Sequence, residues 1–305
     1  MTVPIVVFLY KRPLLVQTLI KELATMRPQT IWLIADGPKC KSEEDNVNQS
    51  RQLAEKSIVW PCSLNLIYSN YNMGLKQRIE SGLDAVFSRE DKAIILEEDC
   101  RPSMRFFSFC EEMLERYRDE PKVAGVSGNC FLPLGSKMKY SYFFSRYLHI
   151  WGWATWARVW NSYDRNNWSW PKGGFREIFP EADRSEVKYW NRIFQRVSAG
   201  EIDTWDYSLL ADLWRRGMVA ITPSENLVDN VGFGSEATNT RDLSIRTGIE
   251  RKAELNLPFH GPALIEADFR SDQAVFRNVF LRMEGRRNMF EKIRDRCIRA
   301  AGLLR

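Results

Sequence analysis

Residues Lys92-Ala-Ile-Ile-Leu-Glu-Glu-Asp99 join a short apolar run to three consecutive acids. The apolar run is typical of a strand buried on both faces, as in a parallel sheet. Ligands of open α/β sheets collect at the carboxyl ends of such strands, where these acids stand. Carboxylates would repel a diphosphate there unless a divalent cation lay between them, and Asp and Glu oxygens suit such a cation. The segment predicts a metal and diphosphate site, with a solvated charge cluster as the alternative.

Further apolar runs rich in Ile, Val and Leu lie upstream, separated by stretches with apolar residues at helical spacing. The expected strands are residues 3–9, 30–35, 64–68 and 93–96, and the expected helices are residues 13–26, 43–56 and 74–87. Such alternation builds β-α-β units with parallel strands and right-handed crossovers. We expect these strands to be buried on both faces. The predicted fold is α/β, with a doubly wound, mostly parallel sheet flanked by helices.

Beyond Asp99 the pattern becomes rich in aromatic residues, and seven of the eleven tryptophans lie between Trp151 and Trp190. The expected elements here are helices at 104–118 and 185–198, a helical segment at 203–216, and strands at 123–128 and 219–222. Sugar rings stack on indole, so Trp151, Trp153 and Trp156 are candidates for an acceptor platform, although buried tryptophan more often belongs to a core.

The chain is expected to form one catalytic domain and a tail. The domain would span residues 1–240, with a nucleotide-binding half at 1–100 and an acceptor and catalytic half at 101–240. Residues 241–305 would be a helical, basic extension, because residues 276–305 hold nine Lys/Arg against three Asp/Glu in a chain of net charge +5. This tail has no aromatic interleaving or groove-reading motif, so nucleic-acid binding is not expected.

The last residues, 288–305, have the pattern of an amphipathic helix. Apolar residues recur at three- and four-residue spacing, with basic residues beside them: Phe290, Ile293, Cys297, Ala301 and Leu304 form the stripe. Such a helix can lie at an anionic membrane surface. The same spacing would suit a helix packed on the catalytic domain or on another subunit. Peripheral contact with the inner membrane face is therefore one of two interpretations.

Cysteine usage and hydropathy indicate a cytoplasmic protein. The six cysteines show no CxxC pair and no histidine cluster of the kind a zinc site requires. The early apolar run from Pro4 to Tyr10 is too short for a signal peptide or a membrane span. We expect reduced thiols and a cytoplasmic enzyme.

Three more segments that follow predicted strands carry candidate ligand-binding residues. Arg12 precedes Pro13, which would open a helix whose N-terminus faces the same sheet edge as the acids. Asp36 is followed by Gly37 and could accept a nucleobase N–H, although Asp-Gly is first of all a turn dipeptide. Lys76 lies in the first turn of the third expected helix, near a diphosphate or merely in solvent. Together they point to one ligand at one edge.

The order of these motifs resembles glycosyltransferases of the GT-A architecture, family 2-like, with Glu97-Glu98-Asp99 in the place of the DxD motif. The resemblance narrows to the family of N-acetylglucosaminyltransferase I over about residues 3–240. It rests on the tryptophan-rich segment 148–160, on Thr204-Trp-Asp-Tyr207 and on Val231-Gly-Phe-Gly-Ser235. The motif differs in its middle residue from the Glu-Asp-Asp of that family, and the membrane anchor of the Golgi enzymes is not seen.

The resemblance implies a role for each matching residue. Asp99 would coordinate Mn²⁺ or Mg²⁺, and Glu97 and Glu98 would support the ribose and the metal waters. Asp206 would be the general base, with Asp203 the next candidate. The remaining contacts would come from Asp36 to the base, Gly152, Trp153 and Trp205 around the acceptor and sugar, and Phe233 and Gly234 over the donor.

The implied function is inverting transfer of a sugar, possibly GlcNAc, from a nucleotide-sugar donor such as a UDP-sugar. The acceptor would be a glycan, a lipid-linked molecule or another hydroxyl compound, for example in bacterial polysaccharide assembly. Two other functions stay open at this point. One is a sugar-nucleotide or glycan-binding module without turnover, and the other is a sugar-1-phosphate nucleotidyltransferase, although Leu9-Tyr-Lys-Arg-Pro13 lacks the glycines of a phosphate loop.

Overall fold

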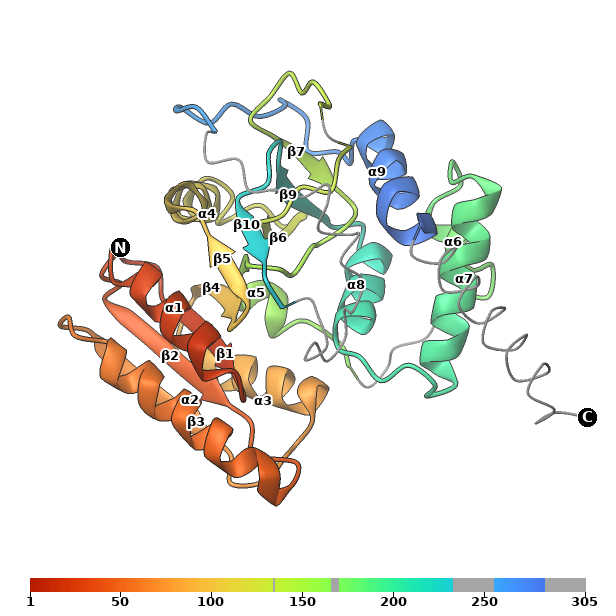
Figure 1. The fold of residues 1–305 in the computed structure, drawn as a ribbon. Coiled ribbons are helices and arrows are strands. Elements are labelled where there is room, and N and C mark those ends of the chain that lie inside the picture. The colour runs from red at the N-terminus through yellow and green to blue at the C-terminus, as the bar shows by residue number, and fades with distance from the viewer. Residues whose placement is uncertain (134, 166–169, 233–254, 283–305) are drawn as a thin grey trace, which may run out of the picture.

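The computed structural model describes residues 1–133, 135–165, 170–232 and 255–282 (Figure 1). The strands are β1 (Ile5–Leu9), β2 (Thr30–Ala35), β3 (Ser63–Tyr68), β4 (Lys92–Glu97), β5 (Cys100–Pro102), β6 (Val123–Ser127), β7 (Tyr142–Ser145), β8 (Trp153–Trp156), β9 (Val219–Pro223) and β10 (Val228–Asn230). The helices are α1 (Pro13–Leu23), α2 (Glu44–Ser57), α3 (Leu75–Phe87), α4 (Met104–Arg116), α5 (Ala157–Trp160), α6 (Phe175–Ile178), α7 (Arg184–Ser198), α8 (Asp206–Arg215) and α9 (Phe269–Val275), with the short 3-10 helix η1 (Lys41–Glu43) and the π-helix η3 (Phe276–Leu281).

The strands form an eight-stranded sheet in the order β3-β2-β1-β4-β8-β6-β9-β7 and a two-stranded ribbon of β10 and β5. Strands β1 to β4 are parallel to one another, as are β6 and β9, while β8 and β7 run antiparallel to their neighbours. The prediction of a mostly parallel α/β sheet flanked by helices is confirmed.

The chain reverses its direction of travel across the sheet at β1. From β1 it moves outward through β2 to β3, and it then returns to β4 on the other side of β1. With right-handed crossovers, α1 and α2 therefore cover one face, where they lie side by side in Figure 1, and α3 covers the other. The carboxyl ends of β1 and β4 flank this switch point, which is where open α/β sheets bind ligands.

Local sequence explains how α1, α4 and α7 begin. Pro13 stands at the first position of α1, where its missing N–H costs no hydrogen bond. Ser103 caps α4 by accepting the N–H of Phe106, and Asp183 caps α7 by accepting the N–H groups of Ser185 and Glu186.

The expectation that every early strand is buried on both faces was wrong for β3. Its side chains are mostly exposed or half-buried, and Leu64 and Leu66 keep 37% and 45% of their surface. Among the described strands β3 pairs with β2 alone, so it is an edge strand. An apolar run by itself does not reveal whether a second neighbour covers it.

The tryptophan-rich region is mostly core. Trp153 and Trp156 are each 2% exposed, which favours the core alternative over an open platform for these two side chains, while Trp151 is half-buried. The first hydrophobic core lies between the large sheet and its flanking helices. A second, separate core is built mainly from aromatic residues of α6, α7, α8 and η3. Its centre is Trp190, whose ring lies 4.9 Å from those of Trp214 and Phe280.

The described part of the predicted extension packs on the rest of the chain. Leu255 and Phe259 belong to the first core, and Val275 and Phe276 belong to the second. The proposed domain boundary at 240 and the predicted helix at 288–305 lie outside the described residues. Within the described ranges, every helix is too short or too polar to traverse a lipid bilayer.

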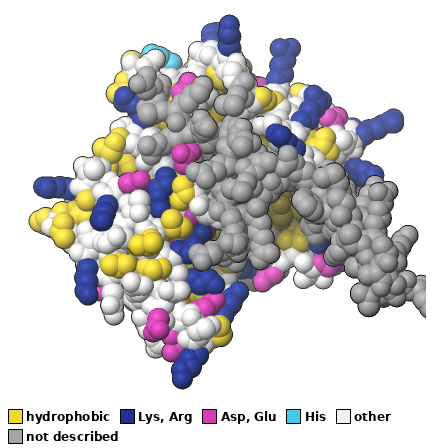
Figure 2. Space-filling view, in the orientation of Figure 1, with side chains coloured by type: hydrophobic (Ala, Val, Ile, Leu, Met, Phe, Trp, Pro, Cys, Tyr) yellow, Lys and Arg dark blue, Asp and Glu magenta, His cyan; other side chains and the backbone are white. Residues whose placement is uncertain are grey.

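The charged side chains of the described residues are mixed on the face that Figure 2 shows. Lys and Arg side chains are scattered over this face, with Asp, Glu and apolar side chains between them (Figure 2). The basic residues drawn there do not gather into one broad patch of the kind that tracks a nucleic-acid backbone.

His149 lies buried between the two cores, and we expect it to make stability depend on pH. Its ring lies 4.6 Å from that of Phe131, and among the described residues its Nε2 has no hydrogen-bond partner. Burial lowers the pKa of His149 to about 3. The unfolded chain therefore binds one more proton between that pH and the ordinary value of about 6.5.

The resulting loss of stability is expected to be about 1.4 kcal/mol per pH unit as the pH falls below about 6.5. His149→Phe, which keeps an aromatic ring but cannot charge, should lose less stability between pH 7.0 and 5.5 in urea unfolding. His260 is exposed, so His260→Asn is the matched control. An identical pH dependence in His149→Phe and wild type would contradict the assignment.

Candidate functional site

The three consecutive acids stand at the sheet's switch point. Glu97 is level with Phe8 of β1, so the chain leaving β1 passes directly beside the acids. The N–H of Tyr10 donates to Glu98 Oε2 at 2.6 Å, and Glu98 is only 3% exposed. The middle acid of the motif is thus turned inward and holds the loop after β1.

Arg12 connects this loop to two of the acids. Its Nε donates to Glu98 Oε1 at 2.5 Å and its Nη2 donates to Asp99 Oδ2 at 2.9 Å. Burial lowers the pKa of Arg12, but the charges of Glu98 and Asp99 outweigh it and hold the pKa above its ordinary value. The Arg12 guanidinium is therefore a permanent cation beside the acids at which the sequence analysis predicts a diphosphate.

Glu97 lies in an environment that opposes its negative charge. Burial, followed by the charge of Asp99, raises the pKa of Glu97 to about 8, and the charge of Asp206 adds to the shift. The charge of Asp206 is thus felt at Glu97, the first of the strand-end acids.

The donor set of this site fits a hard divalent cation. Glu97 and Asp99 are carboxylates that a cation would stabilise in their charged form, and a diphosphate and water can supply the remaining oxygens. In the described parts of the chain, three or more His, Cys, Asp or Glu side chains do not converge into a ready metal cage. A cation here would accordingly depend on its ligand for part of its coordination.

The ribbon of β5 and β10 brings a second segment to Asp99. Its antiparallel pairing sets Asn230 opposite Cys100, and Asn230 Nδ2 lies 3.4 Å from Asp99 Oδ1. A Cβ atom on Gly232 would stand 2.0 Å from Asp99 Oδ2, so the chain approaches this carboxylate as only glycine permits. The sequence offered the Val231-to-Ser235 motif as a signal, but Asn230 was not singled out. Phe233 and Gly234 lie outside the described residues.

Asp36 fastens the loop before α3. Its carboxylate accepts the N–H groups of Gly37, Met73 and Gly74 at 2.9, 2.8 and 3.0 Å, and the side-chain amide of Asn72 at 3.0 Å. A carboxylate has about four lone-pair sites, and four donors fill them. Direct contact between Asp36 and a nucleobase stays a prediction, and it would compete with these bonds.

Two arginines beside Asp36 were missed by the sequence analysis. Arg51 Nη2 donates to the backbone oxygens of Asp36 and Ser69 at 3.0 and 2.6 Å. Arg78 is 7% exposed, and burial lowers its pKa. Both are separated in sequence from the strand ends, so only the fold could reveal that they surround Asp36.

Lys76 and Asp203 form an exposed ion pair with 3.3 Å between Nζ and Oδ1. Lys76 extends from the first turn of α3, and Asp203 lies in the loop that leads to α8. Such a pair contributes little to stability, so Lys76 is available to an incoming diphosphate at small cost.

Asp206 is the first residue of α8 and is half-buried. Burial raises the pKa of Asp206, while the hydroxyl of Thr204, which donates to Oδ1, opposes the rise. A carboxylate whose pKa is raised toward the operating pH is suited to accept a proton. Asp203, the alternative base, is paired with Lys76 and open to solvent.

Gly152, Trp153 and Trp205, the acceptor residues implied by the resemblance, pack beside Asp206 and β10. The ring of Trp153 stacks on that of Trp205 at 5.8 Å, and both side chains are buried. Gly152 has a φ of +69°, and a Cβ atom there would meet Val228 at 2.9 Å. In this structure these residues position Asp206 and β10, while their contact with a sugar or acceptor stays a prediction.

Comparisons with known proteins give only distant structural neighbours. No family model matches the chain, and no curated protein matches it. A mannosyltransferase from Pyrobaculum calidifontis, solved in complex with GDP-Man and Mn²⁺, is 14% identical, with a TM-score of 0.40 over 72% of this chain and 54% of its own. This chain thus spans about half the length of that enzyme.

Two further solved structures are similarly distant. A UDP-glucose pyrophosphorylase in complex with UDP-glucose is 9% identical, with a TM-score of 0.36 over 73% of this chain and 91% of its own. A mannose-1-phosphate geranyltransferase from Thermus thermophilus is 12% identical, with a TM-score of 0.33 over 75% of this chain and 76% of its own. These likenesses are too distant to transfer an activity or a residue role to this chain.

Proposed function

We propose that the protein is an inverting, metal-dependent glycosyltransferase that transfers a sugar from a nucleoside-diphosphate donor, in the first instance a UDP-sugar, to a hydroxyl acceptor. The observation that supports this most is the ion pair of Arg12 with Glu98 and Asp99 at the carboxyl end of β4, the switch point of the sheet. Sugar transfer needs a cationic cradle for the leaving diphosphate and a base for the acceptor. GlcNAc as the sugar and a glycan or lipid-linked acceptor rest on the family resemblance alone.

In this proposal the nucleotide lies along the carboxyl ends of β1, β2 and β4. Arg12 and Lys76 face the diphosphate, and Asp36 holds the loop of residues 72–74 as a wall for the base. Glu97 and Asp99 would hold Mn²⁺ or Mg²⁺. When bound, the cation neutralises the departing diphosphate.

Asp206 carries the chemistry of the acceptor in this proposal. It takes the proton from the acceptor hydroxyl as the oxygen attacks the anomeric carbon, and the bond to the diphosphate breaks on the opposite face. One displacement of this kind inverts the configuration. The hydroxyl of Thr204 orients the Asp206 carboxylate by donating to Oδ1.

A nucleotidyltransferase is the alternative that the same acids could serve, because both reactions use a cation and a nucleotide. Against it stands the segment Tyr10–Pro13, which contains no glycine to wrap a phosphate. The products distinguish the two reactions. A glycosyltransferase releases a nucleoside diphosphate from a sugar nucleotide. A nucleotidyltransferase forms a sugar nucleotide and pyrophosphate from a nucleoside triphosphate and a sugar 1-phosphate. A binding module would yield neither.

We expect Asp99→Asn to weaken UDP binding in the presence of Mn²⁺ by about tenfold or more, or about 1.4 kcal/mol, because an anionic metal ligand is lost. Binding without Mn²⁺ should change less, since it does not use this ligand. Calorimetric titration of UDP with and without Mn²⁺ measures both.

Asp203→Asn is the matched control, because Asp203 is an exposed acid near the same site. It should keep the dependence on Mn²⁺. If Asp99→Asn kept the metal-dependent affinity of the wild type, the assignment of Asp99 to the metal would be wrong.

A further inference from the structure

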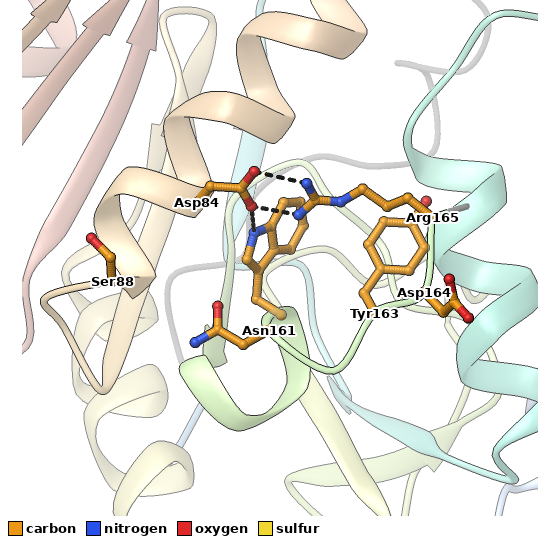
Figure 3. A pocket seen from close by; sticks show the side chains of 7 residues that line it. Asp84, Ser88, Asn161, Tyr163, Asp164 and Arg165 are labelled. Atoms are coloured by element: carbon orange, nitrogen blue, oxygen red, sulfur yellow. Dashed lines mark hydrogen bonds and ion pairs between the residues drawn. The ribbon is translucent and has the colours of Figure 1, made fainter. Parts of the chain in front are cut away.

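A pocket of about 400 Å³ lies between α3 and the segment that follows α5, away from the strand-end acids. Figure 3 shows its lining side chains on the two elements, with Asp84 and Arg165 meeting between them. Asp84 and Ser88 come from the end of α3, and Asn161, Tyr163, Asp164 and Arg165 come from the other wall. None of these residues has a part in the donor site.

A row of polar side chains on α3 leads from the proposed catalytic base to this pocket. Lys76, Glu80, Asp84 and Ser88 are spaced by four residues, which places them on one face of the helix. Lys76 pairs with Asp203 in the loop before Asp206, at the start of the row. From there to Asp84 the helix rises about 12 Å, a span that a short oligosaccharide can cover.

The pocket walls are held in place by their own hydrogen bonds. Asp84 accepts Trp160 Nε1 at 2.8 Å and both terminal nitrogens of Arg165, at 2.8 and 2.5 Å (Figure 3). The guanidinium of Arg165 lies over the ring of Trp160 at 4.9 Å, and Asn161 Nδ2 donates to the backbone oxygen of Phe87 at 3.2 Å. A pre-organised wall costs little entropy on binding.

The chemistry of the lining favours a neutral polyhydroxyl ligand. Both terminal nitrogens of Arg165 are already paired with Asp84, so the pocket offers little attraction to an anion such as a phosphate. Hydroxyl, amide and carboxylate groups surround the pocket, whereas the rings of Trp160 and Tyr163 are mostly buried beneath it. A purely apolar ligand would leave these polar groups unpaired.

We propose that this pocket binds a sugar unit of an oligosaccharide acceptor, some units away from the hydroxyl that reacts at Asp206. The inference rests on the proposed glycosyltransferase function and names its acceptor class: a saccharide chain rather than a single sugar or a small alcohol. The row on α3 is the surface along which the chain lies.

The test uses the indole N–H of Trp160 as a local reporter, because it donates to Asp84 at the pocket wall. Cellobiose, maltose and N,N′-diacetylchitobiose are titrated to millimolar concentrations into ¹⁵N-labelled protein, and Trp160→Phe assigns the resonance. We expect at least one disaccharide to shift it. In Ser88→Trp, which fills the pocket, that disaccharide should bind about tenfold or more weakly. In Ser88→Ala, the matched control, its affinity should stay within about twofold of wild type.

Two results would contradict the proposed sugar site. One is an unchanged Trp160 resonance with all three disaccharides, and the other is equal disaccharide affinity of Ser88→Trp and Ser88→Ala. UDP with Mn²⁺ is titrated into the same samples and should bind Ser88→Trp as it binds wild type, which shows that the variant is folded. If wild-type protein failed to bind UDP, that result would count against the proposed function. The disaccharide titration would still show whether the pocket binds a sugar.

Discussion

Asp206→Asn is expected to lower turnover by about 10²–10⁴-fold while donor binding stays unchanged, because general-base catalysis contributes about this much. The amide cannot take the proton of the acceptor hydroxyl. Its oxygen can still accept the bond from Thr204, so the first turn of α8 should keep its structure. The measurement is release of UDP from the sugar nucleotide with Mn²⁺ and acceptor, alongside calorimetric binding of UDP.

The control for Asp206 is its neighbour in the same loop. Asp203→Asn removes an exposed carboxylate and its ion pair with Lys76, and we expect turnover within a fewfold of the wild type. Wild-type turnover in Asp206→Asn, with a large loss in Asp203→Asn, would instead assign the base to Asp203. A loss of UDP binding in Asp206→Asn would mean that this carboxylate supports the donor site.

Arg146→Met is expected to cost about 3–5 kcal/mol of stability, because it leaves buried acids without a counter-charge. Arg146 is 3% exposed, its Nη2 lies 2.8 Å from Glu186 Oε1, and its Nε lies 3.7 Å from Asp272 Oδ2. Both acids are completely buried. The ring of Phe179 lies 4.8 Å from the guanidinium, and the half-exposed Glu181 lies 3.8 Å from Arg146 Nη1.

The triple variant Arg146→Met, Glu186→Gln, Asp272→Asn is the control, since it removes the acids together with the cation. It should recover much of the lost stability in urea unfolding. The cost of Arg146→Met should also depend on pH. Burial already raises the pKa of Asp272 to about 7 even with Arg146 present. Without the arginine it should rise further above its unfolded value, so stability falls as the pH rises.

Unfolding at pH 5.5 and 8.0 tests this sign. The penalty of Arg146→Met should be larger at pH 8.0. There each buried acid must either carry a charge without a counter-ion or keep its proton although the solution favours its loss. An equal penalty at both values, or a triple variant no more stable than Arg146→Met, would show that lost packing against the aromatic rings dominates.

The sequence predicted several elements of the fold closely, but it did not predict the strands β5, β7, β8 and β10 or what surrounds each element. Residues 30–35 and 104–118 form β2 and α4 with shifts of two residues or fewer, because apolar runs and helical spacing are local properties. It did not predict that β3 lies at an edge, and it left open whether Trp153 belongs to the core. Both depend on which element comes to lie beside them.

At the candidate site, the pattern of strands and helices was enough to predict that the acids after β4 share an edge with the segments after β1 and β2, because parallel strands with right-handed crossovers end together. The role of each carboxylate depends on contacts that appear only in the folded chain: Glu98 holds Arg12, and Asp36 is filled by four donors. The same is true of Asp272, which lies against Arg146 away from this site. Burial and charge pairing join residues far apart in the chain, and these partners meet only once loops such as that before α3 have closed.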